Sequence, residues 1–157
     1  TGHLVLSTIH TNDAVSTISR LINMGIPTYL ISAALSLVVA QRLARKICDD
    51  CKEVDPNTTE TLLQQIGFTA EEASRMKSYK GKGCSKCNST GYKGRQGIYE
   101  VLSVTAKMQD AILQNMSMTE WYQLAADEGF ATMQDMGRQL IGDGRISYEE
   151  FQRVLSS

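Results

Sequence analysis

The sequence carries two short cysteine pairs, Cys48-Asp49-Asp50-Cys51 and Cys84-Ser85-Lys86-Cys87, and it has no other cysteine. A C-x2-C pair turns its backbone around a single ion, so two pairs can bring four thiolates onto one tetrahedral Zn²⁺. Two surface disulfides, or four ordinary buried thiols, are the alternatives. Two such pairs with no spare thiol favour structural zinc. The predicted ligands are Cys48, Cys51, Cys84 and Cys87.

Composition and charge are compatible with an ordinary folded core. The chain has 157 residues, of which 42% are hydrophobic, enough to bury a core in one domain or two small ones. Its amino end, Thr1-Gly2-His3-Leu4-Val5, lacks the basic region and the cleavage site of a signal peptide. Paired thiols without such a signal favour a reducing compartment. We therefore expect a cytoplasmic location.

The first 47 residues read as a small α/β segment. Residues 4–9 form a short apolar run, as expected for a strand covered on both faces, and a polar turn from His10 to Asp13 follows. Residues 14–24 have the periodicity of an amphipathic helix that ends at Gly25. Pro27 is well placed to begin a second, longer helix, which we expect to cover residues 27–47.

The remaining sequence predicts short helices with clear start signals. Capping boxes are expected at Asn57-Thr58-Thr59-Glu60 and Thr69-Ala70-Glu71-Glu72, and again at Ser117…Glu120 and Ser147…Glu150. Glycines flank the second cysteine pair, where a metal knuckle needs positive φ. A strand is expected at 98–102, and helices are expected at 105–115, 118–128, 133–141 and 148–155.

These elements divide the chain into three parts: an α/β segment at 1–47, a cysteine-closed insert at 48–90 and a mainly helical tail at 91–157. The tail is acidic, with four Lys and Arg against nine Asp and Glu after residue 95. A lone strand near residue 4 has no partner within the first part. We therefore expect an α/β protein of which this chain is the carboxyl-terminal part, beginning inside a larger α/β core.

Several stretches resemble one family. The sequence Thr1-Gly2-His3-Leu4-Val5-Leu6-Ser7-Thr8-Ile9-His10-Thr11-Asn12-Asp13-Ala14 resembles the His box of the type II secretion and type IV pilus ATPases. Residues 41–48 and 91–100 are similar to later segments of that family. The two cysteine pairs match the tetracysteine motif of its GspE and PilB branch, which the PilT branch lacks. The similarity runs in order along nearly the whole chain.

The resemblance implies a RecA-like, homo-hexameric ATPase that uses ATP and Mg²⁺ to power pilus or pseudopilus assembly. Such a protein is peripheral to the cytoplasmic side of the inner membrane and works on secretion or pilus platform proteins. Residues 1–47 would then end the nucleotide domain. The sequence contains no G-x-x-x-x-G-K-[ST] motif to cradle phosphates, so the segment alone is expected to be inactive.

The two histidines are candidate catalytic residues on the same grounds. His10 follows the expected strand at its carboxyl end, where ligands bind in open α/β sheets. The resemblance implies that His10 acts on the γ-phosphate or on the attacking water. A histidine satisfied within a polar turn is the alternative. His3 lies near the strand start, and a structural or interfacial role is weighed equally for it.

Two other functions fit parts of the sequence. A stand-alone zinc-binding adaptor would need only the cysteine pairs. A zinc-dependent nucleic-acid binder would use the basic run at 75–95 with Tyr79 and Tyr92. The slightly negative net charge of the whole chain argues against nucleic acid as a partner.

Overall fold

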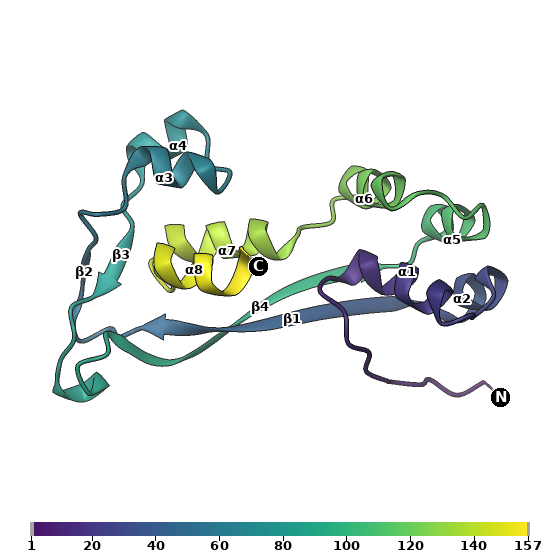
Figure 1. The fold of residues 1–157 in the computed structure, drawn as a ribbon, viewed down its shortest axis with the longest axis horizontal. Helices are drawn as coiled ribbons and strands as arrows, with labels where there is room; N and C mark the ends of the chain where they lie inside the picture. The colour runs from purple at the N-terminus through teal and green to yellow at the C-terminus, as the bar shows by residue number, and fades with distance from the viewer. Residues whose placement is uncertain (1, 157) are drawn as a thin grey trace. The chain divides into compact units, whose positions relative to one another are not determined.

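The computed structural model describes residues 2–156, so Thr1 at the start of the His-box stretch lies outside the described residues. The described part of the chain is a mixed α/β structure (Figure 1). Its elements, in chain order, are α1 (Ala14–Asn23), α2 (Thr28–Ala34), β1 (Leu37–Ile47), β2 (Lys52–Val54), α3 (Glu60–Gln65), α4 (Ala70–Arg75), β3 (Tyr79–Gly81), the 3₁₀ turn η1 (Ser85–Cys87), β4 (Tyr92–Ser103), α5 (Ala106–Leu113), α6 (Met118–Asp127), α7 (Met133–Gly142) and α8 (Tyr148–Leu155).

The strands in residues 2–156 form two small sheets. Strands β1 and β4 pair with each other, although the cysteine pairs and everything between them separate the two in sequence. Strands β2 and β3 pair antiparallel, with Lys52 opposite Gly81 and Val54 opposite Tyr79. The β1–β4 sheet therefore encloses both cysteine pairs in sequence, whereas β2 and β3 both lie between the two pairs.

Side-chain caps define where most helices begin. Asp13 accepts a hydrogen bond from the Ser16 amide at the start of α1, and threonines or serines cap α3 to α8 in the same way. The capping boxes predicted at Thr69 and Ser117 are confirmed. The box predicted from Asn57 is wrong, because Thr59 is the residue that caps α3. Short helices need such caps, since their first amides have no partner within the helix.

One compact unit consists of the chain up to Ala40 together with Glu100–Ala131. Helix α2 packs against α5, and α6 contacts α1 and α5. The Trp121 indole donates to the Ala111 carbonyl at 3.3 Å, which satisfies the only polar atom of this buried side chain. The buried apolar residues of this unit include Val15, Ile18, Ile31, Leu102, Met108, Ile112 and Trp121.

The other compact unit consists of Gln41–Tyr99 and the chain from Thr132 onward. Helix α7 packs against α8, and α3 packs against α4. The backbone amide of Ile47, the last residue of β1, donates to the Arg145 carbonyl between α7 and α8 at 2.9 Å. Its buried apolar residues include Ile47, Leu63, Ile98, Ile141, Ile146 and Phe151.

The long helix predicted over residues 27–47 is wrong. Helix α2 ends at Ala34, Leu35 is extended, and the chain continues as β1. In β1, Val38 and Ala44 are buried while Leu37, Val39 and Leu43 are exposed, an alternation typical of a strand. Pairing with the distant β4 supplies the partner that makes this stretch extended. A helical stripe can be drawn through the same residues, so periodicity alone misled the prediction.

The strand predicted at residues 4–9 is not present. No strand of the described residues pairs with this stretch, and Leu4, Val5 and Leu6 are 87%, 78% and 88% exposed. A strand needs a neighbour for its backbone hydrogen bonds, which explains the result. The strand predicted at 98–102 is present within the longer β4, and the four helices predicted after it are confirmed as α5 to α8. No helix of the described residues is long and apolar enough to cross a membrane.

Candidate metal centre

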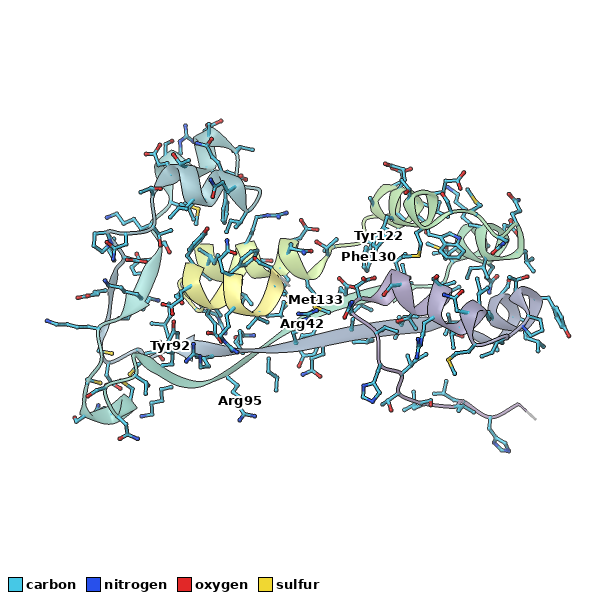
Figure 2. The ribbon with its side chains drawn as sticks, in the orientation of Figure 1. Arg42, Tyr92, Arg95, Tyr122, Phe130 and Met133 are labelled. Carbon is cyan, nitrogen blue, oxygen red and sulfur yellow. The ribbon has the colours of Figure 1, made fainter. Side chains whose placement is uncertain are left out.

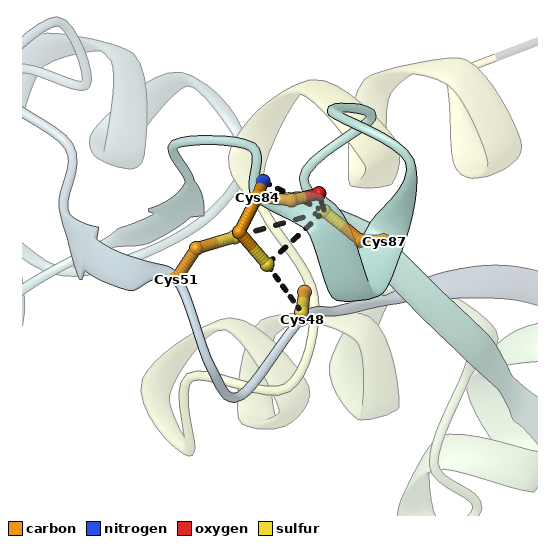
Figure 3. Close-up of side chains that lie close together, drawn as sticks. All are labelled: Cys48, Cys51, Cys84 and Cys87. Carbon is orange, nitrogen blue, oxygen red and sulfur yellow. Dashed lines mark hydrogen bonds between the residues drawn. The ribbon is translucent and has the colours of Figure 1, made fainter.

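The four cysteine sulfurs gather into one cluster (Figure 3). All four Sγ atoms lie within 4.8 Å of one another, with separations of 3.9 Å for Cys48 to Cys84, 3.9 Å for Cys51 to Cys87 and 3.7 Å for Cys84 to Cys87. A disulfide would need about 2.05 Å. Tetrahedral Zn²⁺ with Zn–S bonds of about 2.3 Å holds its sulfurs about 3.8 Å apart. The arrangement can hold a metal ion, and its spacing fits one tetrahedral ion of that size.

Local backbone turns place each cysteine. Cys48 directly follows β1 and Cys51 directly precedes β2, and the Cys51 amide donates to the Cys48 carbonyl at 3.3 Å to close the turn between them. Cys84 caps the 3₁₀ turn η1 and Cys87 ends it, with the Cys87 amide donating to the Cys84 carbonyl at 3.2 Å. The two knuckles are joined because the Cys48 amide donates to the Gly91 carbonyl at 2.9 Å.

Backbone amides also point at the sulfurs. The Cys84 and Gly91 amides donate to Sγ of Cys87 at 3.2 and 3.3 Å, and the Gly83 amide donates to Sγ of Cys51 at 3.3 Å. The Cys84 donor, aided by Gly91, lowers the pKa of the Cys87 thiol to about 6 despite its burial. Burial raises the pKa of Cys51 to about 12. Without a metal, the Cys87 thiol therefore ionises more easily than the Cys51 thiol. A bound cation would displace the protons of its ligands.

Two glycines allow the chain to cross closely beside the cluster. Gly91 has φ +78°, and a Cβ atom there would lie 2.4 Å from the Gly81 carbonyl oxygen. A Cβ atom at Gly81 would lie 1.9 Å from the Gly91 oxygen. Both positions therefore exclude any side chain. The predicted need for positive φ around the second pair is confirmed at Gly83, Gly91 and Gly94.

Charged side chains surround the cluster in pairs. Lys86 lies 2.7 Å from Asp50, and Lys46 lies 2.9 Å from Asp49. The contact with Asp50 raises the pKa of Lys86, which keeps its positive charge beside the sulfurs. Fixed cations near thiolates favour the deprotonated state that a metal requires.

A buried carboxylate anchors the end of β1 that leads into Cys48. Glu150 of α8 accepts from the Arg45 amide at 2.7 Å and from the Arg45 guanidinium at 2.8 and 3.0 Å, and Arg153 donates to both of its oxygens. The Tyr92 ring stacks on the Arg45 guanidinium at 4.1 Å, and the Tyr92 hydroxyl lies 2.9 Å from the Ser147 hydroxyl. Figure 2 labels Tyr92, the first residue of β4. These contacts fix the strand that delivers the first cysteine pair.

The two histidines lie outside the cysteine cluster. His3 and His10 are both exposed and belong to the irregular stretch before α1. His10 lines a shallow hollow of about 320 Å³ together with Thr11, Asn12, Ser16, Arg20 and other residues of the same unit. The prediction that His10 ends a strand is wrong for the described residues, although its place just ahead of a helix start is as expected.

Sequence comparison reveals the family of this chain. The profile of the family described as type II/IV secretion system protein matches residues 1–153. The chain belongs to this family.

Curated relatives cover nearly all of the chain. It is 41% identical over 150 residues to the type IV pilus assembly ATPase PilB of Myxococcus xanthus, an alignment that covers 96% of this chain and 26% of the relative. It is 42% identical to PilB of Pseudomonas aeruginosa, with 98% and 27% covered, and 40% identical to the type II secretion system ATPase E of Vibrio cholerae, with 98% and 30% covered. The chain spans less than a third of the length of these relatives.

Glu100 is a residue of functional interest that the predictions from the sequence did not include. Glu100 is 4% exposed and accepts a hydrogen bond from the Ala14 amide at the start of α1, directly after the stretch that carries His10. Its neighbours on the same strand face, Ile98 and Leu102, are buried apolar residues. An acidic residue on the apolar face of an alternating strand is a recognisable signal of a buried polar contact.

Proposed function

We propose that this segment is the carboxyl-terminal part of a hexameric secretion ATPase that hydrolyses ATP with Mg²⁺ to power assembly of a pilus or pseudopilus. The observation that carries the proposal is the family match over residues 1–153, together with about 40% identity to relatives named as pilus assembly and secretion ATPases. Residues 1–47 would end a RecA-like nucleotide domain, 48–90 would form a zinc subdomain and 91–157 a carboxyl-terminal subdomain. The protein would act at the cytoplasmic side of the inner membrane on platform proteins.

The four cysteines are proposed to hold one structural Zn²⁺. Sulfur separations of 3.7 to 3.9 Å and amides directed at two of the sulfurs support this assignment. Four thiolates leave no open position, so the ion would stabilise the fold and take no part in hydrolysis. The cysteine cluster also supports the second candidate, a zinc-binding adaptor unrelated to ATP, but the family match favours the ATPase.

Zinc content tests the metal assignment. Protein purified without added metal is expected to contain about one zinc per chain, because a structural tetracysteine site binds zinc tightly. Elemental analysis measures this, and Cys84→Ser should lower the zinc content. Asp50→Asn, which alters a neighbour of the cluster and not a ligand, is the control. Disulfides found by mass spectrometry with zinc near zero would contradict the proposal.

The catalytic assignment is tested in the full-length protein. His10→Ala is expected to lower kcat by about 10²-fold and to leave the KM for ATP nearly unchanged, because a group that acts on the γ-phosphate or its water contributes mainly in the transition state. His3→Ala is expected to have a smaller effect. Steady-state ATPase assays, with hexamer formation checked by light scattering, measure both. An intact His10→Ala hexamer with parental turnover would refute the role of His10.

A further inference from the structure

Residues 11–14, which directly follow His10, are held by contacts from three elements of one compact unit. From β4, the Glu100 carboxylate accepts a hydrogen bond from the Ala14 amide. From α6, the Tyr122 hydroxyl donates to Oδ1 of Asp13 at 2.7 Å. Within α1, the Thr17 hydroxyl lies 2.7 Å from the Thr11 hydroxyl and donates to the Asp13 carbonyl at 3.0 Å.

These contacts are more numerous than the start of a helix requires. Asp13 already caps α1 by accepting from the Ser16 amide at 2.8 Å, and a single cap of this kind is the usual arrangement. The additional phenol and the buried carboxylate come from β4 and α6, more than eighty residues away in the sequence. Both carboxylates are favoured at a helix amino terminus, where the dipole is positive. The start of α1 is therefore fixed to its surroundings as well as capped.

The chemistry of Tyr122 suits a permanent tether. Burial, followed by the nearby Asp13 and Glu100 carboxylates, raises the pKa of Tyr122 well above its ordinary value. The phenol stays protonated throughout the physiological range, so it always donates to Asp13. Figure 2 labels Tyr122 on α6 within this unit. Charge-assisted bonds of this kind are stronger and more directional than neutral ones.

His10 itself has a different environment from the residues that follow it. Its side chain is exposed and lines the 320 Å³ hollow, while Ala14, four residues later, is fully buried. A mobile loop would leave the position of the His10 imidazole undefined, whereas an anchored loop holds the imidazole at one position. Fixed placement matters because an error of about 1 Å can cost about 10²-fold in rate.

We propose that Tyr122 and Glu100 are positioning residues that hold the His10 loop in its working geometry. This inference rests on the proposed catalytic role of His10. Neither residue touches the nucleotide in this proposal; both act through the backbone of residues 11–14. Removing either tether should therefore affect turnover only while His10 is present.

A double-mutant cycle in the full-length protein tests the inference. Tyr122→Phe removes the hydroxyl and keeps the ring, and it is expected to lower kcat about 10-fold with little change in the KM for ATP. In the His10→Ala background, the same substitution should change kcat by less than about twofold, because residues that act as one unit are not additive. Tyr148→Phe is the matched control. Its hydroxyl accepts from Gln152 at 2.8 Å within α8, so parental turnover is expected.

Two further measurements exclude a general loss of stability. Hydrogen exchange of a peptide covering residues 10–14 should speed up in Tyr122→Phe and not in Tyr148→Phe. Glu100→Gln, which keeps an acceptor oxygen but loses the charge, should show the same non-additivity with His10→Ala. Suppose that His10→Ala lowers kcat. If Tyr122→Phe then has no effect on kcat, or if its effect simply adds to that of His10→Ala, this inference alone is overturned. Parental turnover in His10→Ala would instead remove the catalytic assignment, and the positioning role with it.

Discussion

Glu150 is a fully buried carboxylate whose charge is balanced by two arginines. Burial by itself would raise its pKa, but hydrogen bonds from Arg153 and Arg45 outweigh that effect and lower the pKa to about 2. The capping box predicted from Ser147 and Glu150 is therefore only half right. Ser147 accepts from the Glu150 amide at 3.1 Å, but the Glu150 carboxylate binds the arginines instead of returning to the cap.

This pKa makes stability depend on pH. An unfolded glutamate has a pKa of 4.5, so the stabilisation is complete above that pH and is lost as the pH falls toward about 2. The shift corresponds to at most about 3 kcal/mol, because both arginines are about half exposed and water screens them. Glu150→Gln should lower the melting temperature at pH 7 and flatten its fall below pH 4.5. Glu149→Gln, an exposed neighbour, is the control; equal melting curves for Glu150→Gln and the parent would contradict the assignment.

At the scale of elements, the sequence predicted the features that depend on residues close together in the chain. Helices α5 to α8 follow from their caps and periodicity, and the cysteine spacing predicted the cluster that the structure shows. Strand β1 could not be predicted in this way, because its partner β4 begins forty-five residues after β1 ends. Glu100 was missed for a related reason: its contact with Ala14 joins residues eighty-six apart. Long-range pairing overrides local periodicity, and no local signal identifies the distant partner.

The crossing of Gly81 and Gly91 gives a prediction at the same scale. Gly91→Ala is expected to destabilise the cysteine-bearing unit by about 2 kcal/mol more than Gly94→Ala, because a Cβ at Gly91 meets the Gly81 carbonyl. Gly94 is the matched control, since its φ of +81° is similar but nothing lies within 4 Å of an added Cβ. Gly91→Ala should also weaken zinc binding in chelator competition, because it disturbs the amide that donates to Cys87. Equal stability of the two variants would disprove the close-approach argument.

On the scale of the whole molecule, each compact unit is assembled from two separate stretches of chain. Helices α7 and α8 belong with the cysteine cluster, although the sequence places them in the tail together with α5 and α6. The Ile47 amide donates to the Arg145 carbonyl, and the Tyr92 hydroxyl bonds to Ser147. These two contacts therefore link the α7–α8 pair to Ile47, which directly precedes the first cysteine pair, and to Tyr92, which follows the second pair.

Removal of the metal should therefore affect the stability of α7 and α8. If zinc is bound, a chelator is expected to reduce amide protection in β2, β3, α7 and α8, because metal binding and folding of the surrounding unit are coupled. Helices α1, α5 and α6 belong to the other compact unit and should keep their protection. Hydrogen exchange with mass spectrometry, with and without the chelator, measures each segment. Cys84→Ser is the control, since it should show the chelated pattern from the start and respond little to further chelation. Loss confined to residues 48–90, with α7 and α8 unchanged, would mean that the cysteine cluster folds independently of these helices.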